Sequence, residues 1–321
     1  MKASVDEPQN ARKRERSDAG EPPRTDVGFD GLVVAGHGRH YIVEPTAGER
    51  LICHPRGKKS ACVVGDRVSC RPTTDSGEEG VIEAVLRRRN LLFRQDEWKT
   101  KAFAANLDQI IVMVASEPVF SESQLARALI AAASADIGAR ILLNKSDMPG
   151  ISQARQRLAP YLDLGAPLTE LSLKARPDEA KALLAPLLGG KTSLLLGPSG
   201  TGKSTLINLL VPEARAQVGE ISQALNSGRH TTTHTQWHWI DRVGGTALID
   251  SPGFQEFGLR QIDAQELPRL MPDIARHTPE CRFYNCSHQH EPGCGVLAAI
   301  ERGEISRSRH RIYGEILREL G

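Results

Sequence analysis

The sequence has few aromatic residues and no long hydrophobic run. Phe, Trp and Tyr make up 4% of the 321 residues, and the longest apolar stretches are residues 110–115 and 128–133. Because a membrane-spanning helix needs roughly 18 to 20 apolar residues, we expect no membrane association. No apolar core follows the basic residues Arg12, Lys13 and Arg14, which argues against a secretory signal.

The net charge is small and cysteines are few. Lys and Arg number 41 and Asp and Glu number 39, so the formal net charge is +2. Hydrophobic residues at 40% and charged residues at 25% are ordinary for a globular protein and exclude a wholly disordered or collagen-like chain. Three of the six Cys lie within residues 281–294, which favours a metal site over disulfides and a reducing, cytoplasmic location.

The chain divides into four segments that differ in composition and in their pattern of apolar residues. Residues 1–30 carry dense charge and are expected to form a disordered tail or an arm that docks on a partner. Residues 31–102 hold five strand-length apolar runs, which predict an all-β barrel of the OB type, although an SH3-like barrel has a similar pattern. Cys53, Cys62 and Cys70 are expected to be core residues of that barrel.

Strands and helices then alternate over residues 103–262, which predicts an α/β domain with a mostly parallel sheet. The expected strands are 110–115, 140–143, 192–196 and 246–249, and the expected helix is 123–135. Residues 263–321 are rich in Pro, Cys and His and end in a charged helix expected at 304–320.

A phosphate-binding loop lies between one of these strands and the next helical run. Residues 197–204 match GxxxxGK[ST] at every fixed position. Its glycines let backbone amides approach phosphate, Lys203 would reach the β- and γ-phosphates, and the Ser204 hydroxyl would bind Mg²⁺. We expect nucleotide contacts from Gly197, Pro198, Ser199, Gly200, Thr201, Gly202, Lys203, Ser204 and Thr205.

Two further motifs follow expected strands and suit a guanine nucleotide. Asp250 and Gly253 form DxxG, with a Mg²⁺-associated carboxylate and an amide for the γ-phosphate. Asn144, Lys145 and Asp147 form NKxD, in which the Asp carboxylate accepts from guanine donors that adenine lacks. Taken alone, NKxD is equally typical of a helix cap. Ser172 and Lys174 end another strand and are candidates to contact the guanine carbonyl.

The motifs occur in an unusual order. NKxD at 144 precedes the phosphate loop at 197, which precedes DxxG at 250, whereas an ordinary GTPase begins with the phosphate loop. The order predicts a circularly permuted GTPase domain.

A first switch is expected between the phosphate loop and DxxG. Residues 228–234 read Gly-Arg-His-Thr-Thr-Thr-His, and we select Thr232 among three adjacent threonines as the Mg²⁺ ligand. Phe254 stands where many GTPases carry the water-orienting Gln, so His230 is the candidate for that catalytic role, with a solvated loop His as the alternative.

Cys281, Cys286, His288 and Cys294 offer three thiolates and an imidazole within 14 residues. This set predicts one structural Zn²⁺, with His290 as a competing ligand and buried thiols as the alternative interpretation.

The surplus of basic residues lies in the predicted barrel. Residues 31–102 contain 13 basic and 9 acidic residues, while the other segments are nearly balanced. Clusters at 56–59 and 87–101 therefore predict an RNA-binding barrel, or else a solvated face.

The permuted order, the barrel, GPSGTGKS, GRHTTTH, DSPG and the Cys/His module together resemble the ribosome small subunit-dependent GTPase A family over about residues 31–321. The resemblance implies an OB-fold domain (31–102), a permuted GTPase domain (103–262) and a zinc-binding domain (263–321). It implies binding of GTP and GDP, and late maturation of the small (30S) ribosomal subunit in the bacterial cytoplasm, with hydrolysis stimulated by that subunit and contacts to its rRNA. It also implies the stated roles for Asn144, Lys145, Asp147, residues 197–204, His230, Thr232, Asp250, Gly253 and the four metal ligands.

Two other functions compete with this one. The first is a nucleotide-gated RNA-binding module whose hydrolysis is incidental, and the second is a metabolic phosphotransferase, which NKxD argues against. We expect a monomer.

Overall fold

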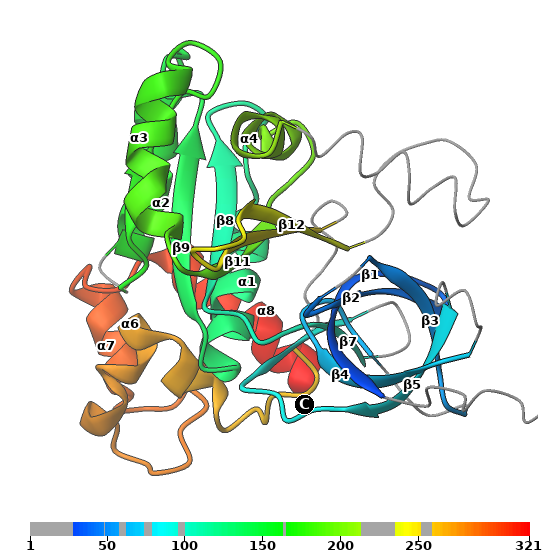
Figure 1. The fold of residues 1–321 in the computed structure, drawn as a ribbon. Coiled ribbons are helices and arrows are strands. Elements are labelled where there is room, and N and C mark those ends of the chain that lie inside the picture. Colours follow the sequence, from blue (N-terminus) through cyan, green and yellow to red (C-terminus); the bar gives the residue numbers. More distant parts are fainter. Residues whose placement is uncertain are drawn as a thin grey trace, which may run out of the picture.

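The computed structural model describes residues 28–47, 49–57, 62–73, 79–95, 100–162, 165–212, 235–251 and 259–321. Figure 1 shows a β-barrel beside a sheet flanked by helices, with a small helical region at the end of the sheet away from α4. Within the described residues no helix is long and apolar enough to cross a membrane.

The N-terminal strands close into a barrel. They are β1 (Phe29–His37), β2 (His40–Pro45), β3 (Leu51–Pro55), β4 (Arg67–Pro72) and β5 (Glu79–Val85). The pairing runs β1-β2-β3-β5-β4 and returns to β1, with β3 and β5 parallel and the other neighbours antiparallel. This five-stranded closure confirms the predicted OB type.

The barrel is filled by alternate residues of these strands. Val33, Val43 and Val68 are fully buried, and Cys53, Cys62 and Cys70 are buried residues of the barrel, as the sequence predicts. The strand expected over 63–70 begins only at Arg67. Residues 63–66 form a turn instead, because the carboxylate of Asp66 accepts the backbone N–H of Val63 at 2.8 Å.

A hairpin that the sequence analysis did not predict follows the barrel. Strands β6 (Leu91–Gln95) and β7 (Thr100–Ala105) pair antiparallel and form a separate two-stranded sheet. Strand β7 runs across residue 102, where the barrel is expected to end, and leads into β8 (Gln109–Ala115). The predicted division into domains stays a prediction.

The second sheet has the order β10-β9-β8-β11-β13-β12. Its strands are β8, β9 (Gly138–Asn144), β10 (Leu168–Glu170), β11 (Thr192–Leu196), β12 (Gln236–Asp241) and β13 (Thr246–Asp250). All neighbours are parallel except β12, which runs antiparallel to β13. Helices α1 (Glu122–Ser134), α2 (Ile151–Leu162), α3 (Pro177–Leu188) and α4 (Lys203–Leu210) connect the strands. Polar loops at the carboxyl ends of such strands are the usual place for a ligand.

Barrel and sheet are joined along β12, which extends toward the barrel in Figure 1. Ala35 of β1 pairs with Gln236 of β12. The buried carboxylate of Glu44 accepts the indole N–H of Trp239 at 2.8 Å and pairs with Arg50 at 2.9 Å. One continuous ladder of strands therefore runs from the barrel into the α/β sheet.

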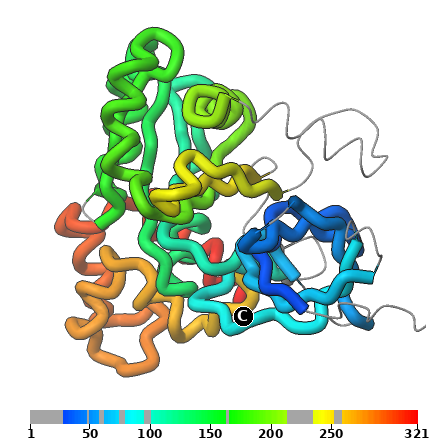
Figure 2. The backbone as a smooth tube through the Cα atoms, viewed as in Figure 1, coloured from blue at the N-terminus to red at the C-terminus, as the bar shows by residue number. Residues whose placement is uncertain are grey.

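The C-terminal region is made of short helices: η1 (Leu267–Leu270), α6 (Pro272–Ala275), η2 (Thr278–Glu280), α7 (Gly295–Glu301) and α8 (Arg307–Leu320). The helix expected at 304–320 begins at Arg307, because the Ser306 hydroxyl accepts the N–H of Arg309 and caps it. Ile312 and Ile316 of α8 belong to the same buried cluster as Leu125 of α1. In Figure 2 the orange part of the tube, which belongs to this region, lies below the sheet.

Candidate functional site

The phosphate-binding motif forms a tight loop between β11 and α4. Gly202 caps α4 with φ 112°, a left-handed backbone that favours glycine. A Cβ at this position would lie 2.3 Å from the side-chain amide nitrogen of Asn144. The loop conformation and the close approach of the NKxD asparagine thus both require glycine at 202.

Asn144 links the two loops through hydrogen bonds. Its side-chain Nδ2 donates to the carbonyl of Thr201 at 2.8 Å, and its Oδ1 accepts the N–H of Leu173 at 3.1 Å. Asn144 is buried at the end of β9. Its side chain therefore positions the surrounding loops, while Lys145 and Asp147 line the cavity beside it.

Asp147 is exposed to this cavity and is oriented by Ser172. The Ser172 hydroxyl donates a short hydrogen bond to Asp147 Oδ1. This hydrogen bond is the main cause that lowers the pKa of Asp147 below its ordinary value. An ionised acceptor therefore faces the space where NKxD predicts a guanine base. Ser172 is itself buried, which holds its hydroxyl in place.

Lys203 and Asp250 lie at the carboxyl end of the central strands. The Lys203 ammonium donates to the carbonyls of Gly197 at 2.6 Å and Pro198 at 3.0 Å. Burial lowers the pKa of Lys203, and the neighbouring Asp250 carboxylate opposes that shift. Burial also raises the pKa of Asp250 to about 6, against the effect of Lys203. A cation beside Asp250 would restore its ionised form, which suits a Mg²⁺-associated carboxylate.

These loops surround a cavity of ≈ 490 Å³, within the range of small-ligand sites. Met148 is the one lining residue that was not predicted from sequence. The other lining residues are Asn144, Lys145, Asp147, Ser172, Lys174, Ser199, Gly200, Gly202, Lys203, Ser204 and Thr205. Gly197, Pro198, Thr201 and Asp250 are predicted residues that are not among the described residues lining this cavity.

Three predicted residues lie outside the described parts of the chain. His230 and Thr232 fall within residues 213–234, and Gly253 falls within residues 252–258. Their proposed roles stay predictions.

The predicted metal ligands come together in the C-terminal region. One ligand atom from each of Cys281, Cys286, His288 and Cys294 lies within 4.8 Å of the others. Cys281 Sγ is 3.9 Å from Cys294 Sγ, and His288 Nδ1 is 3.4 Å from Cys281 Sγ and 3.6 Å from Cys294 Sγ. A tetrahedral Zn²⁺ site has edges of about 3.8 Å between sulfurs and about 3.6 Å between sulfur and nitrogen. The donor set therefore fits zinc.

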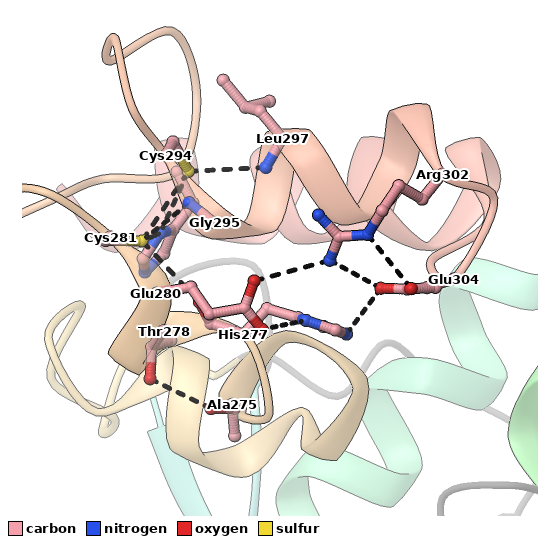
Figure 3. A network of polar contacts seen from close by, with 11 residues as sticks. Ala275, His277, Thr278, Glu280, Cys281, Cys294, Gly295, Leu297, Arg302 and Glu304 are labelled. Carbon is pink, nitrogen blue, oxygen red and sulfur yellow. Dashed lines mark hydrogen bonds and ion pairs between the residues drawn. The ribbon is translucent and has the colours of Figure 1, made fainter.

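Two backbone N–H groups donate hydrogen bonds to cysteine sulfurs of the cluster. The N–H of Gly295 donates to Cys281 Sγ at 3.3 Å, and that of Leu297 donates to Cys294 Sγ at 3.5 Å. Figure 3 shows these contacts beside a network in which His277 bonds Glu280 at 2.9 Å and Arg302 pairs with Glu304 at 2.7 Å. Such outer contacts hold ligands in place and are typical of a structural metal site.

The basic clusters of the barrel are less free than the sequence analysis expects. Arg88 makes a two-pronged ion pair with the fully buried Asp66, at 2.6 and 2.8 Å. Arg89 pairs with Asp108 at 2.8 Å and joins the barrel to the start of β8. Two of the three arginines at 87–89 therefore make structural ion pairs. The sequence analysis does not predict these pairs, because their partners lie 19 and 22 positions away.

Comparison with known proteins places the chain in a family. Residues 85–260, more than half of the chain, match the family described as RsgA GTPase. The chain belongs to the RsgA GTPase family. This is the family that the motifs, their permuted order, the barrel and the Cys/His module together resemble.

Relatives in the RsgA family match nearly the whole chain. The "Small ribosomal subunit biogenesis GTPase RsgA" of Variovorax paradoxus (strain S110) is 59% identical over 296 residues, 91% of this chain and 92% of the relative. The protein of that name from Burkholderia pseudomallei (strain K96243) is 53% identical over 291 residues, 90% of this chain and 91% of the relative.

Two solved structures share the fold. YjeQ from Thermotoga maritima is 31% identical with a TM-score of 0.68, covering 92% of this chain and 99% of that one. YloQ, described as a circularly permuted GTPase, is 24% identical with a TM-score of 0.65, covering 94% and 98%. This RsgA-family chain therefore has the predicted fold class, including the permuted GTPase domain.

Proposed function

We propose that this chain is a GTP-hydrolysing enzyme that acts in the late maturation of the small ribosomal subunit and is stimulated by that subunit. The observation that carries the enzymatic part is the shared cavity of the phosphate loop and the NKxD loop, tied together by Asn144. Membership of a GTPase family supports it. The relatives' names supply the link to small-subunit biogenesis.

Guanine would be selected by Asp147. Its ionised carboxylate can accept both from the ring N–H and from the exocyclic amine of guanine, and the Ser172 hydroxyl fixes its direction. Adenine offers no donor at these positions, so an adenine nucleotide would leave the carboxylate without its partners. Sites built on such hydrogen bonds reject the analogue by factors of about 10⁴.

The phosphates would lie against the 197–204 loop at the start of α4. Lys203 would leave the carbonyls of Gly197 and Pro198 to bind the β- and γ-phosphates. Ser204 and Asp250, with Thr232 as the predicted switch ligand, would hold Mg²⁺, which neutralises charge on the phosphates. His230 is the residue we propose to orient the attacking water.

The cysteine cluster would hold one structural Zn²⁺. Four protein ligands leave no open position for catalysis, so its role is to fix the 281–294 loop. We also propose rRNA contact through the barrel, which the basic surplus of residues 31–102 supports, and a cytoplasmic location, which the relatives' names support. A monomeric state stays a prediction.

Exchange of Asp147 for Asn tests the nucleotide assignment. D147N replaces an acceptor by a donor, so we expect GTP binding to weaken about a thousandfold or more and xanthosine triphosphate, with an oxygen in place of the amine, to be preferred. Competition binding with both nucleotides measures this. Unchanged GTP affinity in D147N would overturn the assignment of the base site.

A further inference from the structure

The turn that carries the metal ligand His288 has an uncommon backbone. His288 is buried and adopts φ 60°, in the left-handed region that residues other than glycine rarely occupy. Such a conformation persists only where the surrounding structure holds it. The Glu291 carboxylate supplies part of that support, because it accepts the backbone N–H of Ser287 at 2.7 Å and that of Gln289 at 3.1 Å. The N–H groups of the turn are therefore bound from within the loop.

Helix α8 binds the carbonyl groups of the same turn. The Tyr313 hydroxyl donates to the carbonyl of Ser287 at 3.1 Å. His310 Nε2 lies 2.7 Å from the carbonyl oxygen of His288, and this nitrogen is the donor because a carbonyl only accepts. Tyr313 is fully buried, and its ring stacks with that of His310 at 6.3 Å between centroids. Two donors on one face of α8 thus hold the main chain of a metal ligand.

The neighbouring residue Arg309 joins α8 to other helices. Its guanidinium donates two hydrogen bonds to the Asp273 carboxylate of α6, at 2.7 and 2.9 Å, and lies over the Tyr161 ring of α2 at 4.9 Å from its centre. The Tyr161 hydroxyl donates in turn to the carbonyl of Glu122 in α1 at 3.0 Å. Arg309 is itself buried. Helix α8 therefore connects the turn of a metal ligand with two helices of the α/β sheet.

Packing links the same parts of the molecule. Tyr313 of α8, Tyr161 of α2 and the metal ligand Cys294 belong to one buried cluster. A Cβ added at Gly314 of α8 would lie 2.7 Å from Gln289 Oε1, so the helix and the turn approach closely. Because protein interiors are close-packed, a shift of α8 against α2 also changes its fit against the turn.

We propose that His310 and Tyr313 are positioning residues of the zinc site, and that metal occupancy is coupled to the docking of α8 on α1 and α2. When the His288 imidazole is held in the metal site, its main chain keeps the geometry that accepts the bond from α8. Coupling between two sites is reciprocal, so a change that loosens α8 at Arg309 must also weaken zinc binding. The inference rests on the proposed zinc site and needs neither nucleotide nor ribosomal subunits for its test.

The test is the zinc dissociation constant, measured by competition with a chromophoric chelator. Y313F keeps the ring and loses the hydroxyl, and its dissociation constant should rise about tenfold, as for other outer contacts of metal ligands. H310L removes the donor and should have a similar effect, whereas H310Q retains an N–H donor and should bind zinc nearly as the unaltered chain does. R311Q is the matched control, because Arg311 is an exposed arginine of α8 that pairs with Glu315.

R309K tests the coupling between α8 and the metal. Lysine keeps the charge but cannot make the two-pronged bond to Asp273, so the docking of α8 is weakened. We expect the zinc dissociation constant to rise about fivefold. Amide hydrogen exchange is the second measure: chelation of zinc from the unaltered chain should speed exchange in residues 307–320 about tenfold or more. Exchange in α3 should not change, since its buried residues belong to a separate cluster.

Three contrary results are distinguishable. Equal zinc dissociation constants for Y313F, H310L and R311Q would overturn the positioning roles. An unchanged constant in R309K, or exchange in α8 that does not respond to chelation, would overturn the coupling. An unaltered chain that holds no zinc would overturn the proposed zinc site and this inference with it, whereas a zinc-bound chain with unaffected variants would overturn the inference alone.

Discussion

The side-chain amide of Asn144 donates to the main-chain carbonyl of Thr201 at 2.8 Å, so a direct hydrogen bond joins the NKxD loop to the phosphate loop. The same side chain accepts the N–H of Leu173, which precedes Lys174 of the cavity. One buried amide therefore sets the relative positions of the base site and the phosphate site. Asn144 therefore acts by positioning the NKxD loop and the phosphate loop relative to each other.

Removal of this amide should weaken nucleotide binding. N144A leaves the Thr201 carbonyl and the Leu173 N–H without their partner, at a cost of about 1–3 kcal/mol. We expect GDP affinity to fall about 10- to 100-fold, measured by titration with a fluorescent GDP. S134A is the control. Ser134 also donates a side-chain hydrogen bond to a main-chain carbonyl, that of Ala131, but within one helix, α1. Wild-type affinity in N144A would show that the two loops do not need this link.

The raised pKa of Asp250 predicts a pH-dependent stability of the nucleotide-free protein. Burial raises this pKa from 3.8 to about 6, so the folded chain binds more protons than the unfolded chain between these values. The stability contribution of the protonated form is fully present below pH 3.8 and is lost as the pH rises through about 6. D250N should remove this loss and be more stable above pH 6 by at most about 3 kcal/mol.

Urea unfolding of both proteins at pH 4.5 and pH 7.5, without nucleotide or Mg²⁺, measures the effect. The difference in unfolding free energy between D250N and the unaltered chain should grow with pH. A constant difference would contradict a raised pKa. D250N should also lose Mg²⁺-dependent GTP hydrolysis, because Asn carries no charge to bind the ion.

Metal content distinguishes the two sets of cysteines. C286S should reduce zinc from one ion per chain to less than a tenth, because three ligands hold the ion far more weakly. C62S replaces a buried barrel thiol and should keep the full zinc content. Native mass spectrometry measures both, and equal zinc in C286S and the unaltered chain would contradict the proposed ligand set. Chelation should also lower the melting temperature, since Cys294 belongs to the main buried cluster.

Arg87 and Arg88 are neighbours with different expected roles. R88Q leaves the buried Asp66 carboxylate without its two-pronged partner and should destabilise the chain by about 3 kcal/mol. R87Q changes an exposed residue and should change stability by less than about 0.5 kcal/mol. Urea unfolding compares them, and equal stability of the two variants would show that the Asp66 pair is not structural.

The sequence predicts the parts of this fold that depend on local pattern. The motif order predicts the permuted sheet, and the cysteine spacing predicts a cluster whose ligand atoms come together as expected. The sequence does not predict the β6–β7 hairpin, because residues 96–99 between its strands contain no Gly, Pro or Asn to signal a turn. The ion pair of Arg88 with Asp66 was missed because it joins residues 22 positions apart. Contacts of this kind depend on how the strands close, which local pattern does not specify.

GTPase turnover titrated with purified small ribosomal subunits, with large subunits as the control, tests the central claim most directly. The account predicts that turnover rises with small subunits to a plateau and stays at the intrinsic rate with large subunits. Turnover that is the same with small subunits, with large subunits and with neither would contradict it. That result would favour an RNA-binding module whose hydrolysis is incidental.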